Sequence, residues 1–510
     1  MSRPALAAAC LALALVTFFQ FPGHTWLQQD TQIYAPILEH QWDPAALRKD
    51  LLSQQPQVAF TLYDEAARGL RVVSGMDFRV VLEIQQVLAR ALGIWGLYLM
   101  ALAAGSRRPF LVAMICALGA TIIGPQVLTF EYEPSPRAIA IPLVMCALGL
   151  AARERYVAAA VAGAAAFLYH PPSALEFWVV FGLCLAWRRR ARPILPIAAA
   201  VAVMAVAAHG HAPQPFFGRI PPFQEQLQRM RAAYNWISLW PRPVIWRHLA
   251  LFAVVLAAYG RLRREIPATL RAFALGLPIL GILSMPLSWL LLERLRWTLI
   301  PQLQPMRALL FVALMAQFLT ALAGARAALD RRFAESAAWF FAAYLASLPA
   351  LDARPVAVAL LLALLAIFAA RSAPVLGLAA FVAIPLLGGV VNYPRLHTPA
   401  LARLAAWARS STPRDAVFLF PDAGHALDPG IFRAEALRAV YVDWKGGGQV
   451  NYSANFAAEW QRRWQLTMTP PADPARDAAL GIDYIVLREA HRLPGAAAFE
   501  NSSYAVYALR

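Results

Sequence analysis

Long apolar stretches alternate with short polar segments along most of the chain. An α-helix needs roughly 20 apolar residues to cross the hydrocarbon core of a bilayer. By that measure the first part of the chain holds about thirteen candidate spans, several of them short. They are residues 5–21, 80–104, 110–129, 136–151, 155–170, 174–187, 193–209, 247–260, 271–292, 306–324, 335–350, 355–370 and 373–391. We therefore expect residues 1–391 to form an all-α polytopic membrane domain.

The pattern changes near residue 392, where apolar stretches give way to shorter mixed runs. Alternating apolar and polar positions predict strands in DAVFLFPD, LRAVYVDWK, DYIVLRE and YAVYALR. Helical periodicity predicts helices in TPALARLAAWARS and ANFAAEWQRRWQ. Residues 392–510 are therefore expected to form a small α/β or α+β domain, which is only just large enough to fold alone.

Composition supports a membrane protein over a soluble one. Hydrophobic residues make up 60% of the 510 positions and charged residues only 15%, whereas soluble domains average about 25% charged residues. The net charge of +17 would point to nucleic acid in a soluble protein. Here it is explained by arginines in short loops, so we expect no nucleic-acid partner. Lysine is almost absent, with only Lys49 and Lys445.

The arginines lie in every second loop, which is the pattern of cytoplasmic loops in membrane proteins. They are Arg3, Arg107, Arg108, Arg153, Arg155, Arg188, Arg189, Arg190, Arg192, Arg261, Arg263, Arg264, Arg326, Arg331, Arg332 and Arg371. An odd number of spans from a cytoplasmic N-terminus places the first loop, residues 22–79, and the C-terminal domain outside. We expect a bacterial inner-membrane protein whose C-terminal domain lies in the periplasm. Bulky Phe18, Phe19 and Phe21 stand where a signal-peptide cleavage site would need small residues, so the first span is predicted to be uncleaved.

The four cysteines all fall within apolar stretches. They are Cys10, Cys116, Cys146 and Cys184. No CxxC pair or Cys/His cluster accompanies them, so we predict buried small apolar side chains and neither a disulfide nor a zinc site.

Charged residues in or at the ends of membrane-spanning helices cost free energy and tend to mark functional sites. Those expected on the outer side are Asp30 in QQDTQIY, Glu131, Glu133 and Arg137 in FEYEPSPR, His170 in YHPPS, and Arg307 after IPQLQP. Acids at early spans and arginines at later ones, all on one face, predict a polar cleft that opens outward.

This architecture resembles the C-type glycosyltransferase superfamily of integral membrane enzymes. The resemblance rests on the long first outer loop with an acid soon after the first span, the number of spans, and the C-terminal outer domain. It implies transfer of a sugar, hexosyl or pentosyl, from a polyprenyl-phosphate carrier to an acceptor at the outer face. Asp30 matches the position of the family's catalytic acid, and Glu131 and Glu133 match a second acidic position. Many members carry two adjacent acids in the first loop, whereas Gln28 and Gln29 precede a single Asp30 here. The resemblance therefore gives little support for a divalent metal, and we expect no other cofactor.

The chemistry of such a transfer explains these residue types. A carboxylate takes the proton of the attacking hydroxyl, and arginine or histidine stabilises the leaving phosphate. Each residue also has an ordinary structural interpretation. Asp30 would cap a helix, Glu131 and Glu133 would be solvated or would pair with Arg137, His170 would end a span, and Arg307 would reach the headgroups. The glycine-rich WKGGGQ at 444–449 lacks the ending of a nucleotide-binding loop and is predicted to be a turn.

Two other classes of function stay open. One is a transporter or flippase of a lipid-linked or small polar substrate, although the sequence has no evident internal repeat. The other is a silent member of the superfamily that acts as an assembly scaffold. In an enzyme, Asp30 should share an outward-facing site with Glu131 or Glu133 and Arg307, whereas a transporter's polar groups would meet near mid-membrane. The sugar, and whether the acceptor is a glycan, a lipid or a protein, are not indicated.

Overall fold

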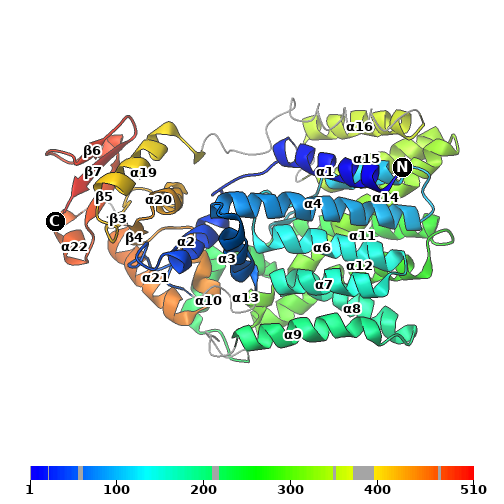
Figure 1. Cartoon of the computed structure of the whole chain (residues 1–510), viewed down its shortest axis with the longest axis horizontal. Helices are drawn as coiled ribbons and strands as arrows, with labels where there is room; N and C mark the ends of the chain where they lie inside the picture. The colour runs from blue at the N-terminus through cyan, green and yellow to red at the C-terminus, as the bar shows by residue number, and fades with distance from the viewer. Residues whose placement is uncertain are drawn as a thin grey trace.

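The computed structural model describes residues 2–20, 22–55, 61–208, 217–348, 352–371, 396–468 and 473–509. It is mostly helical, at 69%. A bundle of long apolar helices occupies one end of the molecule, and a smaller unit of strands and helices occupies the other (Figure 1).

The bundle is built from helices that run along its long axis (Figure 1). They are α1 (Arg3–Phe19), α4 (Phe78–Ala103), α5 (Pro109–Ala117), α6 (Pro136–Ala152), α7 (Tyr156–Tyr169), α8 (Pro171–Trp187), α9 (Leu195–Ala208), α11 (Arg242–Leu262), α12 (Ala268–Ser288), α14 (Leu309–Leu329), α15 (Phe333–Ser347) and α16 (Ala353–Arg371). Among the described residues, 5 helical stretches are long and apolar enough to cross a membrane, and several shorter apolar helices accompany them. The chain is therefore a multi-pass membrane protein.

Eleven of the thirteen predicted spans coincide with helices, but only 5 helical stretches among the described residues are long and apolar enough to cross a membrane, so the number of spans stays a prediction. The other two predicted spans do not coincide with a described helix of that length. The prediction of one span over residues 110–129 is wrong, because α5 ends at Ala117 and is followed by a small antiparallel hairpin of β1 (Thr121–Ile122) and β2 (Val127–Leu128). Gly119 and Gly124 adopt φ values of 73° and 91° there, a left-handed backbone that ends a helix. The predicted span 373–391 lies outside the described residues.

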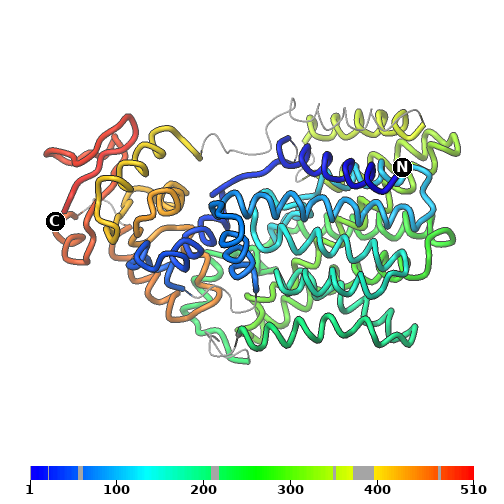
Figure 2. The backbone as a smooth tube through the Cα atoms, viewed as in Figure 1, coloured from blue at the N-terminus to red at the C-terminus, as the bar shows by residue number. Residues whose placement is uncertain are grey.

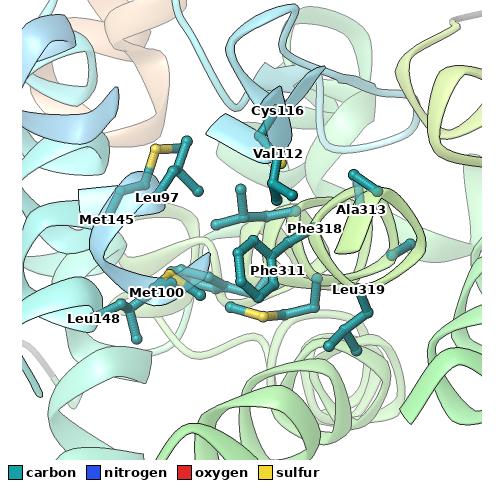
Figure 3. Close-up of a cluster of buried hydrophobic side chains, with 14 of the residues drawn as sticks. Leu97, Met100, Val112, Cys116, Met145, Leu148, Phe311, Ala313, Phe318 and Leu319 are labelled. Carbon is teal, nitrogen blue, oxygen red and sulfur yellow. The ribbon is translucent and has the colours of Figure 1, made fainter. Parts of the chain in front are cut away.

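Helix α14 forms the centre of the bundle. Its most apolar window is completely buried inside the protein. Phe311, Phe318 and Leu319 from α14 pack against apolar side chains of α4, α5 and α6 (Figure 3). Helices α4 and α6 approach closely because both carry glycine at the crossing, where a Cβ on Gly149 would lie 2.2 Å from the Gly96 carbonyl oxygen.

The arginine-bearing loops meet at the end of the bundle away from the C-terminal unit, where the N-terminus also lies (Figure 1). Hydrogen bonds and ion pairs join them: Arg108 to the Ala370 carbonyl (2.8 Å), Arg188 to Glu154 (3.2 Å), Arg261 to Glu335 (3.0 Å) and Arg326 to Glu265. The alternation of arginine along the sequence thus corresponds to one face of the molecule.

The C-terminal unit contains a five-stranded mixed sheet in the order β4 (Ala439–Val440), β3 (Val417–Leu419), β5 (Tyr484–Arg488), β7 (Tyr504–Ala508) and β6 (Phe499–Glu500). Strand β3 pairs in parallel with β4 and β5, and β7 pairs antiparallel with β5 and β6. The helices are α19 (Pro399–Ser411), α20 (Asp428–Ala436), α21 (Ala454–Thr467) and α22 (Pro474–Ala479). All four predicted strands and both predicted helices are confirmed.

The first loop is itself folded and packs onto the C-terminal unit. It contains α2 (Thr31–Trp42) and α3 (Tyr63–Ser74), and the chain trace shows it lying against residues near 430–460 (Figure 2). Leu38 and Tyr63 share one apolar core with Leu404, Phe418 and other residues of the C-terminal unit. Helix α10 (Pro222–Arg231) also packs there, against the 3₁₀ turn η7 (Gly446–Asn451) and α21. The first loop, helix α10 and the C-terminal unit therefore form one outer body, which meets the bundle at one end.

Candidate functional site

Asp30 lies at the junction between the bundle and the outer body, immediately before α2. One carboxylate oxygen is 2.9 Å from a terminal nitrogen of Arg137, and the other is 2.9 Å from Nζ of Lys445. The side chain is 26% exposed, so it remains accessible. It makes no capping hydrogen bond to α2, which argues against the interpretation of Asp30 as a helix cap.

Glu133 holds the N-terminus of α2 instead. Its carboxylate accepts hydrogen bonds from the backbone amides of Gln29 (2.7 Å) and Asp30 (2.6 Å) and from the hydroxyl of Thr31 (2.6 Å). A carboxylate at a helix N-terminus satisfies free amides and complements the helix dipole. Glu133 therefore fixes where the Asp30 side chain stands, and its oxygens are already occupied.

Arg137 connects Asp30 to Glu131. It is the second residue of α6, after Pro136 at the first helical position. Its Nε lies 3.0 Å from a Glu131 oxygen, while its terminal nitrogen reaches Asp30. Both Arg137 and Glu131 are buried, so this pair forms a rigid support beneath the accessible Asp30.

Arg307 and His170 border the same group of charges. Arg307 lies in a 3₁₀ turn, η5 (Pro305–Ala308), and its guanidinium is 5.6 Å from the ring of Tyr234. Its Nε is buried without a hydrogen-bond partner, and no acid among the described residues lies within ion-pair distance. The Arg307 charge acts on Asp30. His170 accepts a hydrogen bond from the Ser173 amide at the start of α8 (3.2 Å), so it ends one helix and begins the next, as its ordinary interpretation predicts.

The charges around Asp30 determine its protonation. Burial alone would raise the pKa of the Asp30 carboxyl, but Lys445, Arg137 and Arg307 together hold it well below its usual range. The pKa of Glu133 is raised instead, by burial and by the neighbouring charge of Asp30, against the hydrogen bonds from Thr31 and Gln29. The cations around Asp30 therefore favour its ionised form.

Lys445 is the member of this site that the sequence analysis missed. It directly precedes η7, in the segment predicted to be only a turn. Trp444 before it is stacked on His425 at 3.6 Å, and the Arg231 guanidinium lies 3.5 Å from the centre of the Trp444 ring. The scarcity of lysine was the one feature of the sequence that could have drawn attention to Lys445, which is one of only two lysines in the chain.

A buried cluster of charged side chains stabilises the segment that carries Lys445. Arg433 on α20 binds Asp50 of the first loop at 2.7 Å and also pairs with Asp443. Asp50 accepts a further hydrogen bond from the Val440 amide (3.0 Å), and Asp443 accepts one from the Gly446 amide (2.9 Å). The first loop and the lysine-bearing segment are therefore tied together by ionic contacts as well as by the shared apolar core.

The site does not fit a bound divalent metal. No group of three or more His, Cys, Asp or Glu side chains is arranged to hold an ion in the described part of the chain. Both oxygens of Asp30 also face cationic partners, which a metal ion would have to displace.

The comparisons with known proteins give structural neighbours and one domain match. Residues 399–467 match a domain of unknown function, DUF6798. No curated protein matches the chain.

Three of the similar solved structures are membrane-enzyme structures at low identity. Arabinofuranosyltransferase AftD from Mycobacteria is 18% identical over 96% of this chain and 35% of its own, with a TM-score of 0.47. ArnT from Cupriavidus metallidurans is 13% identical over 99% and 97%, with a TM-score of 0.46. An oligosaccharyltransferase from Archaeoglobus fulgidus is 12% identical over 95% and 69%, with a TM-score of 0.38. The chain spans about a third of AftD's length. These structures belong to the superfamily that the sequence resemblance named.

Proposed function

We propose that this chain is a membrane glycosyltransferase that moves a sugar from a polyprenyl-phosphate carrier to an acceptor hydroxyl at the outer face of the membrane. The observation that carries the proposal is the setting of Asp30. A partly exposed carboxylate stands among Lys445, Arg137 and Arg307 at the end of an apolar helix bundle. A base beside a cluster of cations suits attack by a hydroxyl on a carbon that carries a phosphate leaving group.

The step is a single displacement with inversion. The acceptor oxygen forms a bond to the anomeric carbon while the bond from that carbon to the phosphate oxygen breaks. The electron pair leaves with the lipid phosphate, and the hydroxyl proton passes to a carboxylate oxygen of Asp30. One carboxylate is sufficient, because a phosphate departs without being protonated.

Lys445 and Arg307 are assigned to the phosphate. With its pKa held low, Asp30 is a weak base while both oxygens pair with cations. A donor phosphate competes for Lys445, and the loss of that contact makes Asp30 more basic when the donor is in place. Arg307, whose Nε has no hydrogen-bond partner in the described part of the chain, supplies a planar pair of donors that fits a phosphate.

The remaining architecture is part of the same proposal. Residues 1–391 form the transferase domain in a bacterial inner membrane, and residues 392–510 form its periplasmic domain. Glu131, Glu133, Arg137 and His170 are assigned to building the site around Asp30. Asp30, Arg137 and Arg307 lie at the starts of α2 and α6 and in the η5 turn before α14, which favours an enzyme over a transporter.

Mass spectrometry of lipid-linked sugars and surface glycans tests the proposal, in cells with and without the gene. The proposal predicts that cells lacking the gene accumulate one polyprenyl-phosphate sugar and lose that sugar from a surface glycan, lipid or protein. Identical profiles in the two strains would contradict it.

A further inference from the structure

A groove on the outer wall of the bundle lies apart from the Asp30 site. It runs between α8 and α12 and has a volume of about 760 Å³. Its walls are apolar, with Val180, Leu183, Gly276 and Leu280 among them, and Leu183 is exposed on its rim. The floor is already tight, because a Cβ on Gly276 would lie 3.0 Å from Val180.

The length of the groove matches one leaflet of a bilayer. Along α8 it extends from Val179 to Arg188, nine helical steps, or about 14 Å at the rise of an α-helix. Half of a hydrocarbon core of about 30 Å is about 15 Å. A chain lying in the groove would therefore reach from the headgroup level to the middle of the membrane.

The two ends of the groove differ in charge. One end is apolar, whereas the other carries Thr269, Arg188 and the exposed Trp187. The guanidiniums of Arg188 and Arg190 lie 5.6 Å and 5.4 Å from the ring of Tyr156, so the ring holds them near one another. The Tyr156 hydroxyl is 3.2 Å from the Thr269 hydroxyl at the groove.

The charge at this end is strongly unbalanced. The adjoining loops, residues 153–155 and 188–192, contain six arginines and one glutamate, Glu154, which pairs with Arg188. Basic pockets between membrane helices bind the headgroups of anionic lipids, and exposed tryptophan favours the same depth.

We propose that this groove is a binding site for one anionic glycerophospholipid of the bilayer. An acyl chain lies along α8 and α12, and the phosphate of the headgroup contacts Arg188 and Arg190. Apolar walls alone would accept any lipid chain, and the arginines select the anionic headgroup. This site is independent of the sugar-transfer chemistry proposed for Asp30.

Native mass spectrometry of the purified full-length protein tests the site. Delipidated protein is incubated with equal amounts of phosphatidylglycerol and phosphatidylcholine that carry the same acyl chains. Wild type should retain phosphatidylglycerol in preference, and Arg188→Gln with Arg190→Gln should reduce that preference about tenfold. The matched control, Arg263→Gln with Arg264→Gln, removes two arginines from another loop and should leave it unchanged.

Filling the groove separates chain binding from headgroup binding. Ala272→Phe, on the groove wall, should reduce retention of both lipids, and Leu183→Gln on the exposed rim gives a second variant that does not depend on core packing. An unchanged preference in the arginine variant would overturn the proposal, as would full retention in both groove variants. Displacement of phosphatidylglycerol by an equal concentration of a polyprenyl phosphate would also overturn it, because the groove would then hold the carrier chain.

Discussion

At the scale of single residues, the contact between Lys445 and Asp30 controls how basic the carboxylate is. Lys445→Met removes the largest of the charge effects that lower the pKa of Asp30. Burial then raises this pKa, and only Arg137 and Arg307 still oppose the rise. A base with a higher pKa is protonated at higher pH, so the acid limb of the kcat/KM profile should move to higher pH. At neutral pH the loss of one charged phosphate contact should lower kcat/KM about tenfold.

The pH profile of purified enzyme against a short-chain polyprenyl-phosphate sugar measures this effect. Lys49→Met is the matched control, because Lys49 is the other lysine and pairs with Asp415 on the surface at 3.0 Å. A Lys445→Met profile with the wild-type acid limb would mean that Lys445 does not act on the base.

Arg307 gives a second residue-scale prediction. Its guanidinium is held by the turn between Pro305 and α14, and it has no acidic partner among the residues that the structure describes. A lysine keeps the charge but cannot present two parallel donors. Arg307→Lys should therefore raise the KM for the lipid donor about ten- to a hundredfold, the equivalent of one charge-assisted hydrogen bond. Arg296→Lys, at a half-exposed arginine that pairs with Glu225, serves as the control. Wild-type donor kinetics in Arg307→Lys would identify Arg307 as a membrane anchor.

The sequence predicted part of this site and not the rest, for a physical reason. Asp30, Glu131 and Arg137 could be grouped because the ends of successive helices meet at one face of a bundle. Lys445 is separated from Asp30 by 415 positions and lies on another domain. Periodicity carries no information about which turn of that domain docks on which loop, so the contact could be found only from the fold.

At the scale of elements, helix α20 joins the first loop to the segment that carries Lys445. Arg433 on α20 is 1% exposed and pairs with both Asp50 and Asp443. Arg433→Met leaves two buried carboxylates without a cation, which costs about 3–5 kcal/mol. We expect a lower unfolding temperature and weaker donor binding, because the Lys445 segment loses its support.

Differential scanning fluorimetry of the purified protein checks the Arg433→Met prediction. Arg462→Met is the control, since Arg462 pairs with Glu459 on the exposed face of α21 and should have little effect. Equal unfolding temperatures for Arg433→Met and wild type would show that the buried charges do not hold the outer body together.

Elements were predicted well where apolar patterns were long and poorly where glycine broke them. The helices α4, α6, α11, α12 and α14 follow directly from their apolar length. The stretch 110–129 has the same apolar character, but Gly119, Gly124 and Gln126 adopt left-handed backbone angles and turn it into a hairpin. A hydropathy window averages over such positions. The packing of the first loop against the C-terminal unit was not predicted, because it depends on close contacts such as that of Gln32 with Gly430.

At the scale of the whole molecule, the arginine loops and the outer body occupy opposite ends of the bundle (Figure 1). We therefore predict that exposed positions Ala45 and Ser502, changed to cysteine, react with a membrane-impermeant maleimide in intact spheroplasts. Ala191→Cys, in an arginine loop, should react only after permeabilisation. The unmodified protein is the background control for labelling of the native cysteines, of which Cys10, Cys116 and Cys146 are buried and Cys184 is partly exposed. Protection of Ala45→Cys or Ser502→Cys would reverse the orientation and place the Asp30 site on the cytoplasmic side.

The central claim is that Asp30 takes the proton of the acceptor hydroxyl. Complementation with Asp30→Asn is its most direct test. Cells lacking the gene receive wild type, Asp30→Asn or the control Asp43→Asn, and their lipid-linked sugars and surface glycans are quantified by mass spectrometry. Loss of a general base lowers the rate about 10²–10⁴-fold. The account predicts that wild type and Asp43→Asn restore the glycan, while Asp30→Asn reaches the membrane in equal amount and leaves the lipid-linked sugar unused. Restoration of the glycan by Asp30→Asn to the wild-type level would contradict it.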